Sequence, residues 1–148
     1  MCEYCGCQEI TAIGDLTREH EAVVNLIGQV RAAHGHRDVA AMADLARRIE
    51  AILGPHTEVE ERALFPALAA DFAGPIAILE AEHRRIGAVL KEAPGDPSWP
   101  DRLVAVLAVL REHILKEQDG VFPAALASLR TEDWETIDAV RARVGCSL

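Results

Sequence analysis

The sequence is poor in aromatic residues, with three Phe, two Trp and one Tyr among 148 positions. Because hydrophobic residues still make up 50% of the chain, aliphatic side chains must form most of its core. That hydrophobic fraction is too high for a disordered chain, and ten Gly with seven Pro are too few for a collagenous or low-complexity one. The length fits one ordinary domain.

Positive charge and long apolar runs are also scarce. Lys and Arg number 15 against 24 Asp and Glu, for a formal net charge of −9, so we expect no binding to nucleic acid or anionic lipid. The uncharged apolar stretch from Leu103 to Leu110 has eight residues, well short of the roughly 20 that cross a bilayer, and we expect no membrane association. No basic segment followed by an apolar one opens the sequence, which favours a cytoplasmic location.

Period-two alternation is absent as well, so the sequence predicts no strand. Apolar residues instead recur at steps of three and four, which predicts helices over the following stretches: Asp15 to about His34, Val39 through a kink at Gly54 and Pro55 to Leu64, Ile76 to Leu90, Pro100 onward, and a weaker one from about Glu132 to Val144. We therefore predict an all-α fold, an antiparallel up-down four-helix bundle over residues 15–130. A Cys-containing arm (residues 1–14) precedes the bundle, and a short C-terminal helix and tail (residues 131–148) follow it.

An internal repeat relates the two halves of the chain at an offset of 57 residues. Residues 56–67 (HTEVEERALFPA) and 113–124 (HILKEQDGVFPA) share His, Glu, Phe, Pro and Ala at matching positions. Residues 16–20 (LTREH) and 79–83 (LEAEH) match more loosely. Each half thus contains one lone His and one His-x-x-x-Glu, which predicts a duplicated helical hairpin. We interpret Phe65, Phe122, Pro66 and Pro123 as core plugs and helix stops.

The polar residues of the repeat fall on the apolar faces of the predicted helices. In the fourth helix, His113 and Glu117 continue the seam of Leu103, Val106 and Leu110. A rise of about 1.5 Å per residue, counted from the turns, brings the lone His and the His-x-x-x-Glu of each hairpin to nearly one height. We expect six side chains to face the bundle axis: His20, His56, Glu60, His83, His113 and Glu117. Three others that each precede a His by one position are expected on the solvated face: Glu19, Glu82 and Glu112.

Two inward carboxylates among four imidazoles indicate a metal site, because a buried carboxylate without a partner costs several kcal/mol or more. A single His-x-x-x-Glu is usually an ordinary contact, but two copies with two further His favour ligands. Imidazole and carboxylate without sulfur suit iron, with manganese or zinc as alternatives. Six ligands would saturate one octahedral ion. Two ions bridged by Glu60 and Glu117 would each keep about two positions for an oxo or hydroxo bridge and a small diatomic molecule or peroxide.

These motifs, from about Leu16 to Pro123, resemble the hemerythrin-like, or HHE cation-binding, family in its bacterial cytoplasmic form. The resemblance implies a four-helix bundle around a non-haem di-iron centre with this ligand set: His20, His56, Glu60, His83, His113 and Glu117. Oxygen-carrying members use five His and an Asp beside one Glu, whereas here Gly87 stands four positions beyond His83. Four His with two Glu is more similar to iron-centre repair proteins and to bacterial members linked to peroxide and nitric oxide.

The resemblance therefore favours reaction with hydrogen peroxide, O2 or nitric oxide over reversible oxygen carriage. As an enzyme, the chain would run a catalase-like or nitric-oxide-reducing cycle at two iron ions. As a delivery protein, it would be a labile iron store, a sensor or an iron donor to a protein partner. A structural bundle with two zinc ions is a third alternative.

Cysteine is confined to the two ends of the sequence, at Cys2, Cys5, Cys7 and Cys146. These four thiols would suit zinc or an iron-sulfur cluster. They could instead form a reversible disulfide, pass electrons or hand iron on. The alternative without function is a frayed tail with spare thiols.

Overall fold

The computed structural model describes residues 7–148, with side chains from residue 11 onward. It is all-helical, and residues 7–148 contain no strand. The elements, with the two π-helical segments written η, are α1 (Cys7–Gly35), α2 (Val39–Val59), η1 (Glu60–Leu64), α3 (Phe65–Leu90), α4 (Trp99–Lys116), η2 (Glu117–Val121), α5 (Phe122–Ser128) and α6 (Thr131–Val144). The all-helical fold predicted from the sequence is thus confirmed.

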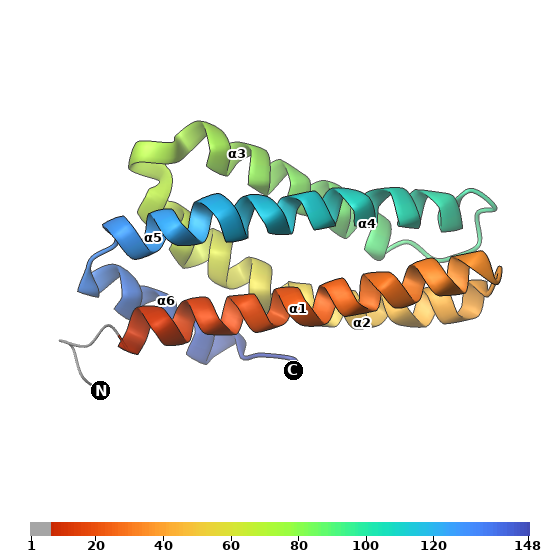
Figure 1. Cartoon of the computed structure of the whole chain (residues 1–148), viewed down its shortest axis with the longest axis horizontal. Coiled ribbons are helices and arrows are strands. Elements are labelled where there is room, and N and C mark those ends of the chain that lie inside the picture. Colours follow the sequence, from red (N-terminus) through yellow and green to blue (C-terminus); the bar gives the residue numbers. More distant parts are fainter. Residues whose placement is uncertain (1–6) are drawn as a thin grey trace.

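Short connections fold the long helices back on one another (Figure 1). The chain reverses after α1 through a turn in which Arg37 has a φ of 56°. The carboxylate of Asp38 then accepts a hydrogen bond from Ala41 N at 3.0 Å and caps α2. α2 packs along α1, α3 along α4, and α4 also contacts α1. The small helix α6 packs against α1 and α2, near the first turns of α1 (Figure 1).

Two apolar clusters fill the bundle, one toward each end. The first includes Val30, Met42, Ile49, Leu103 and Leu107. The second includes Leu16, Val59, Leu64, Leu79 and Trp134. On α1, α2 and α3 the predicted inward His lies between residues of the first cluster and residues of the second, and on α4 His113 lies at the end of the first cluster, ahead of Phe122 of the second. The packing therefore places the polar residues inside the bundle and away from both of its ends.

Several helix boundaries differ from those predicted. α1 begins at Cys7 rather than Asp15, because Ala12 and Ile13 pack on the second cluster and extend the helix. The expectation that Pro66 and Pro123 stop their helices is wrong. Each is the second residue of the helix that follows a π segment, where a missing N–H costs little.

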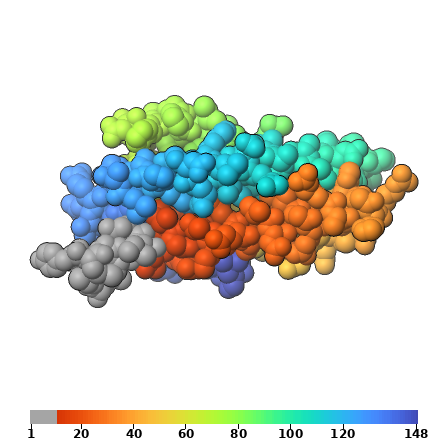
Figure 2. Space-filling model, in the orientation of Figure 1, coloured from red at the N-terminus to blue at the C-terminus, as the bar shows by residue number. Residues whose placement is uncertain are grey.

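The third helix consequently begins at Phe65, well before the predicted start at Ile76. It bends instead at Phe72, which has a φ of −133° and a ψ of 34°. Pro75 lacks the N–H that would donate to Asp71 O, and its ring crowds that carbonyl, which explains the bend. In Figure 2 the first part of α3, coloured yellow-green, stands as a ridge beside α4 and α5.

One helical run, Val39–Leu90, contains a window long and apolar enough to cross a membrane by length and composition. The stretch from Ala63 to Leu79, with Asp71 as its one charged residue, accounts for this property. A single such helix is weak evidence for a membrane span, because core helices of soluble proteins pass the same test.

Candidate metal centre

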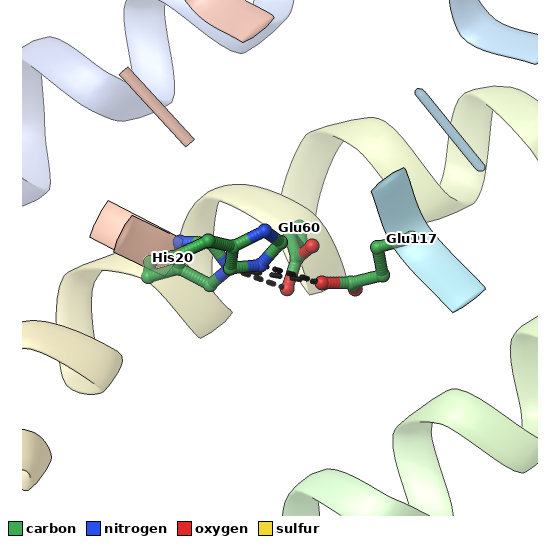
Figure 3. Close-up of side chains that lie close together, drawn as sticks. His20, Glu60 and Glu117 are labelled. Atoms are coloured by element: carbon green, nitrogen blue, oxygen red, sulfur yellow. Dashed lines mark hydrogen bonds and ion pairs between the residues drawn. The ribbon is translucent and has the colours of Figure 1, made fainter. Parts of the chain in front are cut away.

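The structure brings together all six side chains that the sequence predicts to face the bundle axis. They form two groups in which one ligand atom per residue lies within 4.8 Å of the others. One group contains His20 and His56 and the other contains His83 and His113. Both groups include Glu60 and Glu117, so the two carboxylates are shared. Figure 3 shows His20, Glu60 and Glu117 pointing toward one another.

Glu60 connects the two groups from the end of α2. Its Oε1 atom lies 3.2 Å from His56 Nε2 and 3.3 Å from His83 Nε2. Neither Glu60 oxygen has a hydrogen-bond partner within the described part of the chain, although both are buried. A buried carboxylate without hydrogen bonds is unfavourable unless a cation or proton neutralises it.

Glu117 occupies the equivalent position at the end of α4. Its Oε1 atom lies 2.9 Å from His20 Nε2 and 3.8 Å from His56 Nε2, and its Oε2 atom lies 3.2 Å from His113 Nε2. Oε2 is a third buried oxygen for which the described residues provide no hydrogen bond. The Nε2 atoms and these carboxylate oxygens thus converge, and they are a donor set that suits a borderline or hard metal ion. The residues fit a metal centre.

The other ring nitrogen of each His is held by a polar side chain. The pairs, at Nδ1, are His20 with Gln118 at 3.2 Å, His56 with Glu19 at 3.1 Å, His83 with Glu61 at 3.0 Å and His113 with Glu82 at 3.1 Å. A proton on Nδ1 leaves Nε2 as the free lone pair that binds metal. These contacts therefore fix the tautomer and the ring orientation that metal ligation at Nε2 requires.

The predicted solvated role is wrong for two of the three glutamates that precede a His. Glu19 is fully buried and contacts His56. Glu82 is half-buried and contacts His113. Both face the neighbouring helix, because a position one residue from the core seam of a bundle lies at a helix interface. Glu112 is exposed, as predicted.

The sequence contains a signal for these positioning residues. The two segments that match in the repeat both contain Glu-His, at residues 19–20 and 82–83, and Glu60-Glu61 corresponds to Glu117-Gln118; the third Glu-His, at residues 112–113, has no repeat partner and its Glu112 is exposed. In each pair one residue belongs to the inward set and the other contacts an Nδ1 atom. Reading the repeat as pairs would therefore have identified all four positioning residues.

The family model for the hemerythrin HHE cation binding domain matches residues 11–125. The chain belongs to the hemerythrin family. The match covers every residue of the two ligand groups and ends before α6. It makes the chain a metal-binding protein whose cluster of His and Glu is the candidate site. No curated protein and no solved structure matched the chain.

Two π-helical segments shape this hemerythrin site. Phe65 N donates to Glu60 O and Phe122 N donates to Glu117 O, each across five residues. In an α-helix with 3.6 residues per turn, positions five apart lie roughly 140° apart around the axis. The wider π turn brings them closer to one face, as is common at functional sites.

Each phenylalanine of the repeat stacks on a ligand His from the other half of the chain. Phe65 stacks on His83 with ring centroids 5.7 Å apart, and Phe122 stacks on His20 at 5.4 Å. Both phenylalanine side chains are buried in the second cluster. They act as the core plugs that the sequence predicts, and they limit the rotation of these two imidazoles.

Charge inside the centre is balanced between imidazoles and carboxylates. Burial lowers the pKa of His83, but Glu60 and Glu61 outweigh it and raise that pKa to about 9. Burial would also lower the pKa of His56, but the carboxylates of Glu60, Glu117 and Glu19 outweigh burial and hold that pKa well above its ordinary value. Burial would raise the pKa of Glu117, but contacts with neighbouring side chains, among them the imidazoles of His113, His20 and His56, hold it well below the usual range. The metal-free site thus favours protons on its imidazoles, and a metal cation would displace them.

A cavity of about 350 Å³ reaches the centre between α2 and α3. All four inward His line this cavity, whereas Glu60 and Glu117 do not. Gly54 and Gly87 lie in its wall, and an added Cβ at either one would meet no atom within 4 Å. The cavity therefore approaches the imidazoles from a side that the shared carboxylates do not occupy.

The predicted Cys site is not described by the structure. Cys2 and Cys5 lie outside the described residues, and Cys7 is the first residue of α1 with its side chain undescribed. Cys146 is exposed and has a free thiol. A cluster of these four thiols stays a prediction.

Proposed function

We propose that this hemerythrin domain holds two iron ions and that they react with hydrogen peroxide, O2 or nitric oxide. The observation that carries the proposal is the pair of ligand groups that share Glu60 and Glu117, with three buried carboxylate oxygens to which the described residues donate no hydrogen bond. Two carboxylates common to two imidazole pairs match the need of two adjacent ions, whereas one ion in either group would contact four of the six residues and leave the other His pair unused.

Each residue has a specific role in this proposal. His20 and His56 would bind one ion, and His83 and His113 the other, each through Nε2. Glu60 and Glu117 would bridge the ions and fix their separation. When bound, the iron pair would supply electrons to a small molecule or accept electrons from it.

The surroundings determine what reaches the centre. The cavity between α2 and α3 provides a path of about 350 Å³ to the imidazoles. Phe65 and Phe122 lie on the ligand rings, and the two apolar clusters lie above and below them. This arrangement excludes bulk water from the carboxylate side and leaves the cavity as the approach for a small neutral or anionic ligand.

Peroxide turnover tests the proposal. Iron-loaded protein is mixed with excess hydrogen peroxide while an oxygen electrode and an optical spectrum record the reaction. A catalase-like cycle converts two H2O2 into one O2 and two H2O, so many moles of O2 per mole of protein are expected. The same assay under argon with nitric oxide tests the alternative ligand. Absence of any spectral change with peroxide, O2 and nitric oxide would contradict the proposal.

A further inference from the structure

A chain of hydrogen bonds links α6 to His56. Arg141 Nη2 lies 2.6 Å from Glu19 Oε1, and Arg141 Nη1 lies 3.0 Å from Glu19 Oε2. Arg141 Nη1 also donates to Gly145 O at 3.0 Å. Both carboxylate oxygens are thus held in the bidentate geometry that fixes the plane of a carboxylate. Glu19 Oε1 in turn contacts His56 Nδ1 at 3.1 Å, so Arg141 acts on the His56 ring through Glu19.

The equivalent chain in the other half is looser. Lys116 Nζ makes one contact of 2.7 Å, to Glu82 Oε2, and Glu82 Oε1 contacts His113 Nδ1 at 3.1 Å. An ammonium group is a point charge with rotatable donors and does not fix the carboxylate plane.

Burial strengthens the contrast between the two chains. The exposed side-chain fraction is 0% for Glu19 and 15% for Arg141. It is 18% for Glu82 and 49% for Lys116. Exposed ion pairs contribute little because water and salt screen them. The position formed by His20 and His56 is therefore braced by a buried two-point contact, and the other is not.

The stronger brace comes from a helix outside the matched domain. The hemerythrin match ends at residue 125, and α6 begins at Thr131. α6 is anchored by buried Trp134, Ile137 and Val140. It packs against α1, α2 and η1, the elements that carry His20, His56 and Glu60.

We infer that the two metal positions retain their ions unequally, and that Arg141 is the positioning residue that slows loss from the position of His20 and His56. This inference rests on the two-ion centre proposed above. The ion held by His83 and His113 leaves first. α6 thereby makes one position exchange its ion slowly and leaves the other to exchange faster.

Zinc release from the full chain tests this inference. Protein loaded with zinc is mixed with excess chelating dye, and two kinetic phases of equal amplitude are expected. Outer hydrogen-bond partners of ligand His typically change metal affinity 10–100-fold, so Arg141→Gln should speed the slow phase about tenfold and leave the fast phase unchanged. Arg141→Lys keeps the positive charge but loses the two-point contact, so it should give an intermediate rate. It replaces Arg141→Gln in the test if that variant does not fold.

Two controls separate positioning from general loosening. Arg143→Gln makes the same charge change at an exposed residue of α6 and should leave both phases unchanged. Lys116→Gln should affect the fast phase alone. In NMR spectra of zinc-loaded protein, the signal of the His56 Nδ1 proton is assigned by its absence in His56→Gln. This signal should persist until the slow phase of zinc release. The proton should exchange faster with water in Arg141→Gln.

The outcomes distinguish failure of the unequal retention from failure of the two-ion centre. Two zinc ions released in one phase, equal acceleration of both phases by Arg141→Gln, or the same effect from Arg143→Gln would overturn the inference alone. Fewer than two zinc ions bound at the start would overturn the two-ion centre, and the inference with it.

Discussion

Glu19 Oε1 lies 3.1 Å from His56 Nδ1, although Glu19 is the immediate chain neighbour of His20. One dipeptide therefore serves two ligands of the same group: His20 directs its Nε2 into the centre while Glu19 orients the His of the adjacent helix. Glu82 and His83 repeat this relationship toward His113. The metal centre is thus stabilised across helix interfaces, which couples its geometry to the packing of α1 on α2 and of α3 on α4.

The first prediction concerns this contact. Glu19→Gln removes the charge that orients His56 and should lower affinity for the metal at this position by roughly 10- to 100-fold. Competition with a chelator of known affinity measures the change. Glu21→Gln, an exposed change on the same helix, is the matched control, and equal affinity in the two variants would contradict the positioning role.

A second prediction concerns access through the cavity. Gly87 lies in the cavity wall, and a Cβ there would meet no atom within 4 Å, so the Leu side chain of Gly87→Leu begins in open space and should narrow the cavity. It should slow azide binding to the iron-loaded protein, followed optically, while metal content stays at the wild-type value. Gly28→Leu, on α1 where an added Cβ also meets nothing within 4 Å, should bind azide normally. Unchanged azide kinetics in Gly87→Leu would show that small ligands enter elsewhere.

A third prediction concerns pH and the metal-free protein. Because the pKa of His83 is raised from 6.5 to about 9, its protonation stabilises the fold fully below about pH 6.5 and less as pH rises through about 9. This loss should amount to up to roughly 3 kcal/mol. The lowered pKa of Glu117 acts in the opposite direction and removes stability in acid, below its usual value of 4.5.

Urea unfolding at several pH values measures this dependence. The alkaline loss should disappear in metal-loaded protein, because a metal ion replaces the proton on the imidazole. Metal-free protein that is as stable at pH 9 as at pH 6.5 would contradict the charge arrangement described here.

Substitution of the N-terminal cysteines distinguishes a catalytic function from iron delivery. Replacing Cys2, Cys5 and Cys7 with Ser should leave oxygen evolution from peroxide unchanged if the chain is an enzyme, because the six His and Glu alone hold the metal. If it is an iron donor, the same variant should transfer less iron to an apo-acceptor protein. Cys146→Ser is the control, and a parallel loss of peroxide turnover in the triple variant would contradict the catalase-like function.

Much of the fold and of the inward residues could be predicted because both follow helical periodicity. His113 and Glu117 continue the leucine seam, and their counterparts His56 and Glu60 recur at an offset of 57 residues. A pattern of that kind identifies the face of a helix, and the repeat shows that two helices share it.

The remainder depends on contacts between elements, which periodicity does not contain. Glu19 lies at a helix interface, and the interface is defined only once α2 packs on α1. The π turns at Glu60 and Glu117 give Pro66 and Pro123 positions in a first helical turn, so prolines that indicate a stop are accommodated. Arg141 reaches Glu19 across 122 residues, and no local motif marks that contact.

Metal content per chain tests the central claim most directly. Elemental analysis of protein purified from iron-replete cells, with an optical spectrum before and after peroxide, should show two irons per chain and a band that peroxide changes. His113→Ala and Glu60→Ala should retain one ion or none, whereas His34→Ala, at the far end of α1, should retain both. One zinc or no metal in the wild-type chain, or two irons retained in both ligand variants, would contradict the account.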